Sequence, residues 1–177
     1  MIIIGIDPGT IITGYGIIKD TGTSIHRVAN GTIKIPNSTS LPQKLELIYN
    51  ELMKIIKRNK PDEFAIETAF YGKNVQSAMK IGYARGVAIL AAISSKLPVS
   101  EYSPRQIKKA VVGKGSASKE QVNYMVKTLL GLKSTTLKTD ESDALATAVC
   151  HAFRINSVKR TGSNWKAFIE ANPDRVI

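Results

Sequence analysis

The chain has 177 residues, of which 43% are hydrophobic, and its 25 lysines and arginines outnumber its 14 aspartates and glutamates to give a net charge of +11. This length suits one domain, and its near-zero mean hydropathy excludes a chain that is disordered throughout. The longest apolar run, Val87 to Ile93, is far shorter than the ~20 residues of a membrane span, and the N-terminus lacks the basic start of a signal peptide. With a single cysteine, Cys150, which we expect to be a small buried residue, the composition predicts a cytoplasmic protein.

Apolar patterning predicts an α/β fold in one domain. The continuous apolar run Ile2–Ile6 is typical of a strand buried on both faces, and residues 14–18 and 25–35 are expected to form two more strands. The later elements alternate, which indicates a mixed five-stranded sheet flanked by helices. They are helices over 41–58, 77–93, 104–112, 119–130 and 140–153, and strands over 64–66 and 99–102. We expect the domain to cover residues 1–156, with a loosely held tail over the polar segment 157–177.

Positive charge is concentrated in the middle of the chain. Between Thr68 and Lys119 the only acidic residue is Glu101, whereas this stretch holds nine lysines and arginines, counting Lys119 itself. A surface of one sign repels itself unless a polyanion binds it, and nucleic acid is the obvious polyanion. The alternative is a solvated basic face that only keeps the protein soluble.

Two acidic residues end predicted strands. Asp7 follows the first strand and Glu67 the fourth, and each comes directly after an apolar run where an unpartnered carboxylate is costly. If these strands are parallel neighbours, both carboxylates emerge at one edge of the sheet, where α/β folds place their sites.

A third acidic motif, Asp140-Glu-Ser-Asp143, opens the last predicted helix. Asp140 and Asp143 are three residues apart and therefore share a helix face. They could cap the helix and favour its dipole, or they could bind metal. Their presence beside Asp7 and Glu67 in an otherwise basic chain favours metal binding.

A cluster of four carboxylates needs a counter-cation, because otherwise some of the groups would keep their protons. Oxygen ligands suit Mg²⁺ or Mn²⁺, and the sequence has no cysteine–histidine cluster for zinc. We expect His26 and His151 to be structural. Two metal ions beside a basic face predict metal-dependent hydrolysis of nucleic acid.

Several motifs together resemble the RuvC family of bacterial Holliday-junction resolvases. They are Ile4-Gly-Ile-Asp7-Pro-Gly-Thr10, Thr13-Gly-Tyr-Gly16, Phe64-Ala-Ile-Glu67, Tyr83-Ala-Arg-Gly-Val-Ala88, the segment 111–119 and Asp140-Glu-Ser-Asp143-Ala-Leu-Ala146. The match runs over about residues 1–153 in the family's order.

This resemblance implies a ribonuclease H-like fold and a homodimer that nicks two opposed strands of a four-way DNA junction in recombination and repair. It implies that Mg²⁺, two ions per site with Mn²⁺ able to substitute, is held by Asp7, Glu67, Asp140 and Asp143. It further implies functional lysines at Lys108 and Lys119, a junction-probing aromatic residue at Phe70, and partnership with the RuvA–RuvB branch-migration complex.

The chain departs from the family pattern in three places. Thr68 stands where a longer polar residue is expected, so strand-sequence preference could differ. Lys114, between two glycines, is outside the pattern and is given only an electrostatic role. The end of the chain, from Gly162 to Ile177, matches nothing in the family pattern. Beside Phe70, which could stack on an unpaired base, Tyr71 is interpreted as a core aromatic residue.

Gly82 and Gly86 lie one turn apart on one face of the helix predicted over 77–93, near Met79, Ile89, Leu90 and Ile93. Because glycine costs a helix up to ~1 kcal/mol, two glycines indicate close approach of another element. That element is either the chain's own sheet or the same helix of a second subunit.

Three alternative functions remain for comparison. Asp7-Pro-Gly-Thr10 also resembles the phosphate loop of actin-like ATPases and sugar kinases, but those proteins need two related lobes and 177 residues supply one. A non-catalytic junction-binding protein would not need all four acids. A nuclease that acts on RNA–DNA hybrids is the alternative within the same fold.

Overall fold

The structure, a computed structural model, describes residues 1–68, 75–132 and 136–171, and describes side chains as far as Ser157. Five strands form one mixed sheet in the order β3-β2-β1-β4-β5. β1 pairs antiparallel with β2 and parallel with β4, β2 pairs antiparallel with β3, and β4 pairs parallel with β5. The strands are β1 Ile2–Asp7, β2 Ile12–Asp20, β3 Ile25–Lys34, β4 Glu63–Glu67 and β5 Val99–Tyr102.

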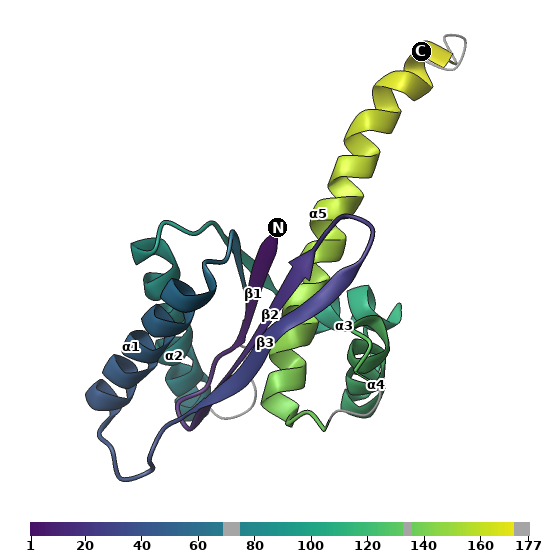
Figure 1. The fold of residues 1–177 in the computed structure, drawn as a ribbon. Helices are drawn as coiled ribbons and strands as arrows, with labels where there is room; N and C mark the ends of the chain where they lie inside the picture. The colour runs from purple at the N-terminus through teal and green to yellow at the C-terminus, as the bar shows by residue number, and fades with distance from the viewer. Residues whose placement is uncertain (69–74, 133–135, 172–177) are drawn as a thin grey trace.

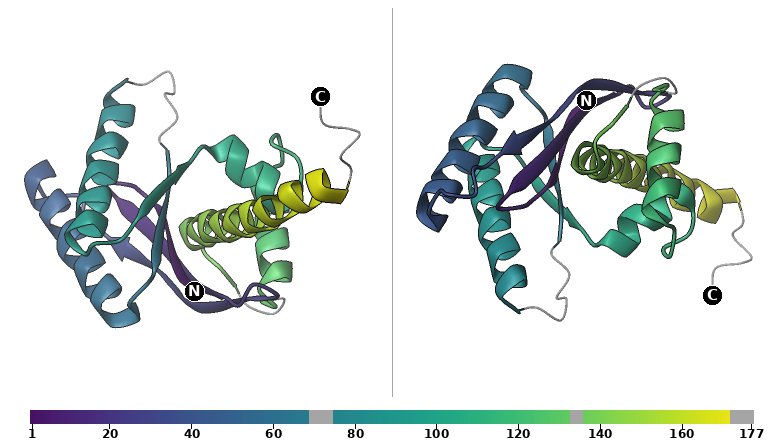
Figure 2. Two further views of the ribbon diagram at one scale, coloured as in Figure 1. Left: turned by 90° about the horizontal axis from the view of Figure 1, so that it is seen from above. Right: turned by 90° about the horizontal axis from the view of Figure 1, so that it is seen from below.

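Helices cover both faces of the sheet (Figures 1 and 2). α1 and α2 lie together on one face, and α5 crosses the other with α3 and α4 packed beside it. The helices are α1 Leu41–Asn59, α2 Val75–Ser94, α3 Pro104–Val112, α4 Lys119–Leu129 and α5 Thr139–Ala171. Of the helices in the described ranges, none is both long and apolar enough to cross a membrane.

The starts of α3 and α4 are fixed by matching capping boxes. The Ser103 hydroxyl accepts from the backbone N–H of Gln106 at 3.3 Å, and the Gln106 side chain accepts from the Ser103 N–H at 2.8 Å. Ser118 and Gln121 repeat this arrangement at 3.3 and 2.9 Å. Such caps stabilise a helix start by about 1 kcal/mol and therefore fix where the following lysines stand.

Two apolar cores lie on opposite faces of the sheet. Ile4, Ile6 and Phe64 point toward α1 and α2, whereas Ile3 and Ala65 point toward α5. Alternate residues of one strand therefore enter different cores, as the pleat requires. The buried run in β1 confirms the prediction of a strand covered on both faces.

Glycines of β1 and β2 let α5 lie directly on the sheet. A Cβ atom on Gly5 would stand 2.2 Å from the carbonyl oxygen of Ala144, and one on Gly14 would stand 2.1 Å from that of Asp140. A Cβ on Gly16 would stand 2.7 Å from the backbone nitrogen of Leu145. Any larger residue would push the helix away, so these three glycines set the depth at which the acidic start of α5 meets the sheet.

α5 is longer than the sequence pattern predicted. The predicted helix ended near Phe153, but α5 continues to Ala171 and projects beyond the sheet (Figure 1). The residues from Ala144 to Ala152 are all buried against the core, and this largely apolar run is the part of α5 that the sequence identifies as a helix. Beyond the core the sequence becomes polar, although the backbone stays helical. The boundary between residues 156 and 157 stays a prediction.

Candidate active site

A cavity of about 290 Å³ opens where the carboxyl ends of β1 and β4 meet α3, α4 and α5. Asp7 ends β1 and Glu67 ends β4, and the two strands are parallel neighbours in the sheet. Both carboxylates therefore reach the same edge, and both line the cavity. Its other charged residues are Lys108, Lys119 and Asp143. We call this space the carboxylate cavity.

The opposite wall comes from helices that begin beside the sheet edge. Asp143 lies in the first turns of α5, and Lys119 is the first residue of α4. The Lys119 Nζ donates to Asp143 Oδ2 at 3.2 Å. Asp143 is also the main cause that raises the pKa of Lys119, which therefore stays protonated. Lys108, one turn into α3, faces the same space.

Burial, and after it repulsion between carboxylates, sets the electrostatics of the cavity. Burial raises the pKa of Asp7 to about 7, with further contributions from Asp143 and Asp140 that Lys119 only partly offsets. Burial likewise raises the pKa of Glu67 to about 7, with Asp7 and Asp143 adding to the shift. At neutral pH both groups are therefore poised between the acid and the carboxylate.

This donor set fits a hard divalent cation. All the anionic groups of the cavity are carboxylates, and the raised pKa values of Asp7 and Glu67 reflect burial and repulsion from neighbouring carboxylates, which the nearby lysines only partly offset. A divalent ion would supply that charge. In the described part of the chain, however, no three histidine, cysteine, aspartate or glutamate side chains are already grouped as a metal cage.

Asp140 stands apart from the other three acids. It lines a neighbouring cavity of about 440 Å³ together with the β1–β2 turn and α2. Its charge still raises the pKa of Asp7, so the two carboxylates are electrostatically linked. The structure thus brings Asp7, Glu67 and Asp143 into one cavity and places Asp140 at its neighbour.

Sequence reasoning assigned no role to Glu141, which the structure ties to the sheet. The Asn30 side chain, on β3, donates to Glu141 Oε2 at 2.8 Å, and Asn30 Oδ1 accepts from Arg27 at 3.1 Å. This contact holds the first turn of α5 against the edge strand. Because Asn30 and Glu141 are 111 residues apart, no local pattern could have paired them.

The remaining predicted residues have varied settings. Phe70 and Tyr71 lie outside the described residues. His151 is buried, and its Nδ1 lies 2.7 Å from the Tyr102 hydroxyl, while His26 contacts the Ser24 hydroxyl at 2.9 Å on the exposed part of β3. Neither histidine lines the carboxylate cavity, which agrees with a structural role.

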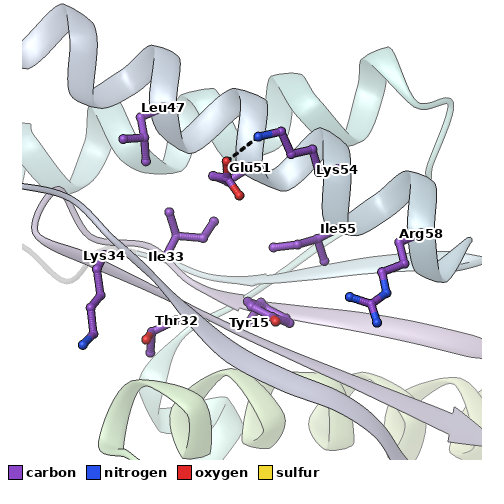
Figure 3. A pocket seen from close by; sticks show the side chains of 9 residues that line it. All are labelled: Tyr15, Thr32, Ile33, Lys34, Leu47, Glu51, Lys54, Ile55 and Arg58. Atoms are coloured by element: carbon purple, nitrogen blue, oxygen red, sulfur yellow. Dashed lines mark hydrogen bonds and ion pairs between the residues drawn. The ribbon is translucent and has the colours of Figure 1, made fainter.

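Another cavity, of about 460 Å³, lies between α1 and the β2–β3 part of the sheet (Figure 3). Lys34, Lys54 and Arg58 line it, and Glu51, its one acidic residue, pairs with Lys54 at 2.7 Å. Because its single carboxylate already has a cationic partner, this space is a poor candidate for metal-dependent chemistry.

Comparison with known proteins gives one consistent result. A family model described as "Crossover junction endodeoxyribonuclease RuvC" matches residues 3–151. Curated proteins of that name are similar to this chain. The protein of Salinibacter ruber is 42% identical over 177 residues, which cover 99% of each chain. The protein of Cytophaga hutchinsonii is 45% identical over 175 residues, which cover 99% of this chain and 88% of the relative.

Solved structures agree with this result. Thermus thermophilus RuvC in complex with a Holliday junction substrate aligns with a TM-score of 0.84 at 32% identity, over 89% of this chain and 96% of that one. The yeast mitochondrial resolvase Ydc2 shares the fold, with a TM-score of 0.66 at 13% identity over 96% of this chain and 83% of that one. The predicted ribonuclease H-like fold is confirmed.

Proposed function

This chain belongs to the RuvC family of crossover junction endodeoxyribonucleases, and from that premise we propose that it resolves Holliday junctions by metal-dependent hydrolysis of phosphodiesters in two opposed strands. The reaction would serve homologous recombination and DNA repair. The observation that carries the proposal is the carboxylate cavity, where Asp7 and Glu67 have pKa values of about 7 beside Lys108 and Lys119. Anionic ligands and cationic side chains in one space suit a reaction at a phosphate.

Asp7, Glu67 and Asp143 are the residues that we propose hold Mg²⁺, as two ions that Mn²⁺ can replace. A metal ion bound by these residues would supply Lewis acidity at the phosphate and would lower the pKa of the attacking water. Asp140 is proposed as a further ligand, because its charge reaches Asp7 although its side chain lines the neighbouring cavity.

Lys119 and Lys108 are proposed to stabilise charge that develops on the phosphate. Lys119 is held toward the acids by its contact with Asp143, and both helices that carry these lysines start at capping boxes. A fixed cation aimed at developing charge lowers the barrier without reorganising during the reaction. Phe70 is proposed to stack on an unpaired base at the crossover.

A homodimer through α2 is the assembly that we propose. Among the residues that the structure describes, none lies within 4 Å of a Cβ added to Gly82 or Gly86, so the interpretation that these glycines pack on the chain's own sheet is wrong. Large apolar residues beside them are 44% to 70% exposed, at spacings of three, four and seven that place them in one stripe. These residues, the α2 stripe, are Val75, Met79, Tyr83, Leu90 and Ile93.

The α2 stripe fits a second copy of the same helix. Its spacing is that of a helix–helix seam, and the glycines permit close approach of the two backbones. Ile89, predicted to join this surface, packs partly buried against the chain's own core instead. A two-fold axis at α2 would present two carboxylate cavities to two like strands of one junction. We propose the RuvA–RuvB complex as a further partner on the family premise alone.

The function is tested with a labelled four-way junction, a linear duplex and an RNA–DNA hybrid of the same sequence, each incubated with and without Mg²⁺. We expect paired nicks in the junction only, and only with metal. Faster cleavage of the hybrid would transfer the function to that substrate, and binding of the junction with Mg²⁺ but without cleavage would make this a junction-binding protein.

A further inference from the structure

The cavity that Asp140 lines has no role in the function proposed above. It lies between the β1–β2 turn, residues 9–12, and the start of α2, from which Ser77, Lys80 and Ile81 contribute. With about 440 Å³ it is larger than the carboxylate cavity, and Asp140 is a neighbour of both. We call it the adjoining cavity.

The turn that forms one wall of the adjoining cavity is fixed in shape. The Thr13 hydroxyl, which is fully buried, donates to the Gly9 carbonyl at 2.7 Å and accepts from the Gly9 N–H at 3.2 Å. A Cβ on Gly9 would stand 2.3 Å from the Ile12 carbonyl oxygen, so the turn has room only for glycine. Thr10 and Ile11 are therefore held in place before any ligand arrives.

The opposite wall supplies the charge. Lys80 is exposed, and among the residues that the structure describes it forms no ion pair. On the turn, Thr10 adds a hydroxyl group, and the side chain of Ile11 is 57% exposed. An ammonium group facing a hydroxyl suits a phosphate, and an exposed aliphatic side chain suits the apolar edge of a sugar. The ammonium group also disfavours a metal ion in this space.

We propose that the adjoining cavity binds the nucleotide next to the scissile phosphodiester, with Lys80 paired to its phosphate and Ile11 packed on its sugar. The inference rests on the proposed function, because it requires the scissile phosphate to lie at Asp7 and Glu67. A strand so placed continues past Asp140 toward α2. Asp140 repels the adjoining phosphate, and Lys80 offsets that repulsion from the other wall.

The test combines Lys80→Gln with junctions in which one phosphate at a time, on either side of the scissile one, is a neutral methylphosphonate. For the unmodified junction we expect Lys80→Gln to lower kcat/KM about tenfold, because one charge-assisted contact is lost. One methylphosphonate should lower the kcat/KM of the unsubstituted protein by a similar factor. With the methylphosphonate at that position, Lys80→Gln should not lower kcat/KM any further, since the charged phosphate that Lys80 would contact is already absent.

Lys57→Gln, which removes an exposed lysine on α1, is the matched control. It should leave kcat/KM unchanged, or lower it by the same factor whichever phosphate is neutral. Additive losses for Lys80→Gln at every position would overturn the inference while leaving the resolvase function intact. Junction binding without metal provides an independent measurement. The logarithmic salt slope of Lys80→Gln should be smaller by about one, and an unchanged slope would overturn the inference even if the protein cleaved no junction.

Discussion

Glycines have different surroundings on the two sides of the sheet. On the α5 face, Gly5, Gly14 and Gly16 belong to the strands and bring the helix backbone into contact with the sheet. On the other face, Gly82 and Gly86 belong to the helix and look outward into open space. The first arrangement positions acidic side chains within one chain, whereas the second leaves a surface that another chain can cover. We therefore expect catalysis to depend on the α5 side of the sheet and self-association to depend on the α2 side.

Changes at the carboxylates should have the largest effect. Asp7→Asn or Glu67→Gln removes one carboxylate, a proposed metal ligand, from the carboxylate cavity, so we expect junction cleavage to fall by about 10³-fold or more. Junction binding should persist or tighten, because negative charge near DNA is lost. Cleavage rates and binding in Ca²⁺, which should support little hydrolysis, separate the two effects. Glu51→Gln, in the cavity beneath α1, should change neither.

The pH dependence of the protein's stability should report on the buried carboxylates of the same cavity in the absence of DNA. Asp7 and Glu67 have pKa values raised to about 7, so between about pH 4 and 7 the folded chain holds protons that the unfolded chain has released. Their contribution to stability is full below about pH 4 and is lost as the pH rises to about 7. The loss should be on the order of a few kcal/mol, measured as a fall in Tm of metal-free protein. Asp7→Asn should flatten the curve, and added Mg²⁺ should restore stability at pH 7. An unchanged curve in Asp7→Asn would rule out this origin.

The lysines of the carboxylate cavity should affect catalysis more than binding. Lys119→Ala and Lys108→Ala should each lower the cleavage rate by about 10²-fold, the size expected when one group that stabilises developing charge is removed. Lys114→Ala, which does not line the cavity, should only weaken binding and reduce the salt slope by about one. If all three variants behaved like Lys114→Ala, Lys108 and Lys119 would be phosphate contacts only.

The strand glycines sharpen the comparison through a pair of matched substitutions. Gly14→Ala should force α5 from the sheet, lowering the free energy of unfolding by about 1–3 kcal/mol and lowering metal affinity as Asp140 and Asp143 move. Gly82→Ala meets open space and should leave the monomer as stable or up to ~1 kcal/mol more stable. Thermal unfolding and a calorimetric Mg²⁺ titration of both variants give the comparison. Equal stability and equal metal affinity would contradict it.

The smallest expected effect is on self-association. Leu90→Ala removes exposed apolar surface from the α2 stripe and should weaken the dimer about tenfold, since the change occurs in both subunits. Val28→Ala, an exposed apolar residue on β3, is the control and should leave association unchanged. Sedimentation over a concentration series measures both. A stripe variant that associates as tightly as the unchanged protein would place the interface elsewhere.

What the sequence could predict depended on local pattern. Asp7 and Glu67 were recognisable because each directly follows a buried strand, and the pairing of β1 with β4 then brings them together. The separation of Asp140 from Asp143 was hidden, because a helix face says nothing of which cavity each side chain lines. Asn30 and Glu141 meet only through the tertiary fold. In the sequence, Gly5, Gly14 and Gly16 were recognised only as parts of motifs, and their role became clear only from the structure, in which α5 packs against them.

One assay tests the division between the two faces most directly: cleavage of a supercoiled plasmid that extrudes a cruciform. The unchanged protein should produce linear plasmid, since the proposed dimer would nick two opposed strands within one binding event. Leu90→Glu combined with Ile93→Glu should yield nicked circles, because single subunits still cleave, and Asp7→Asn should leave the plasmid supercoiled. Linear product from the stripe variant, or any cleavage by Asp7→Asn at the rate of the unchanged protein, would contradict the account.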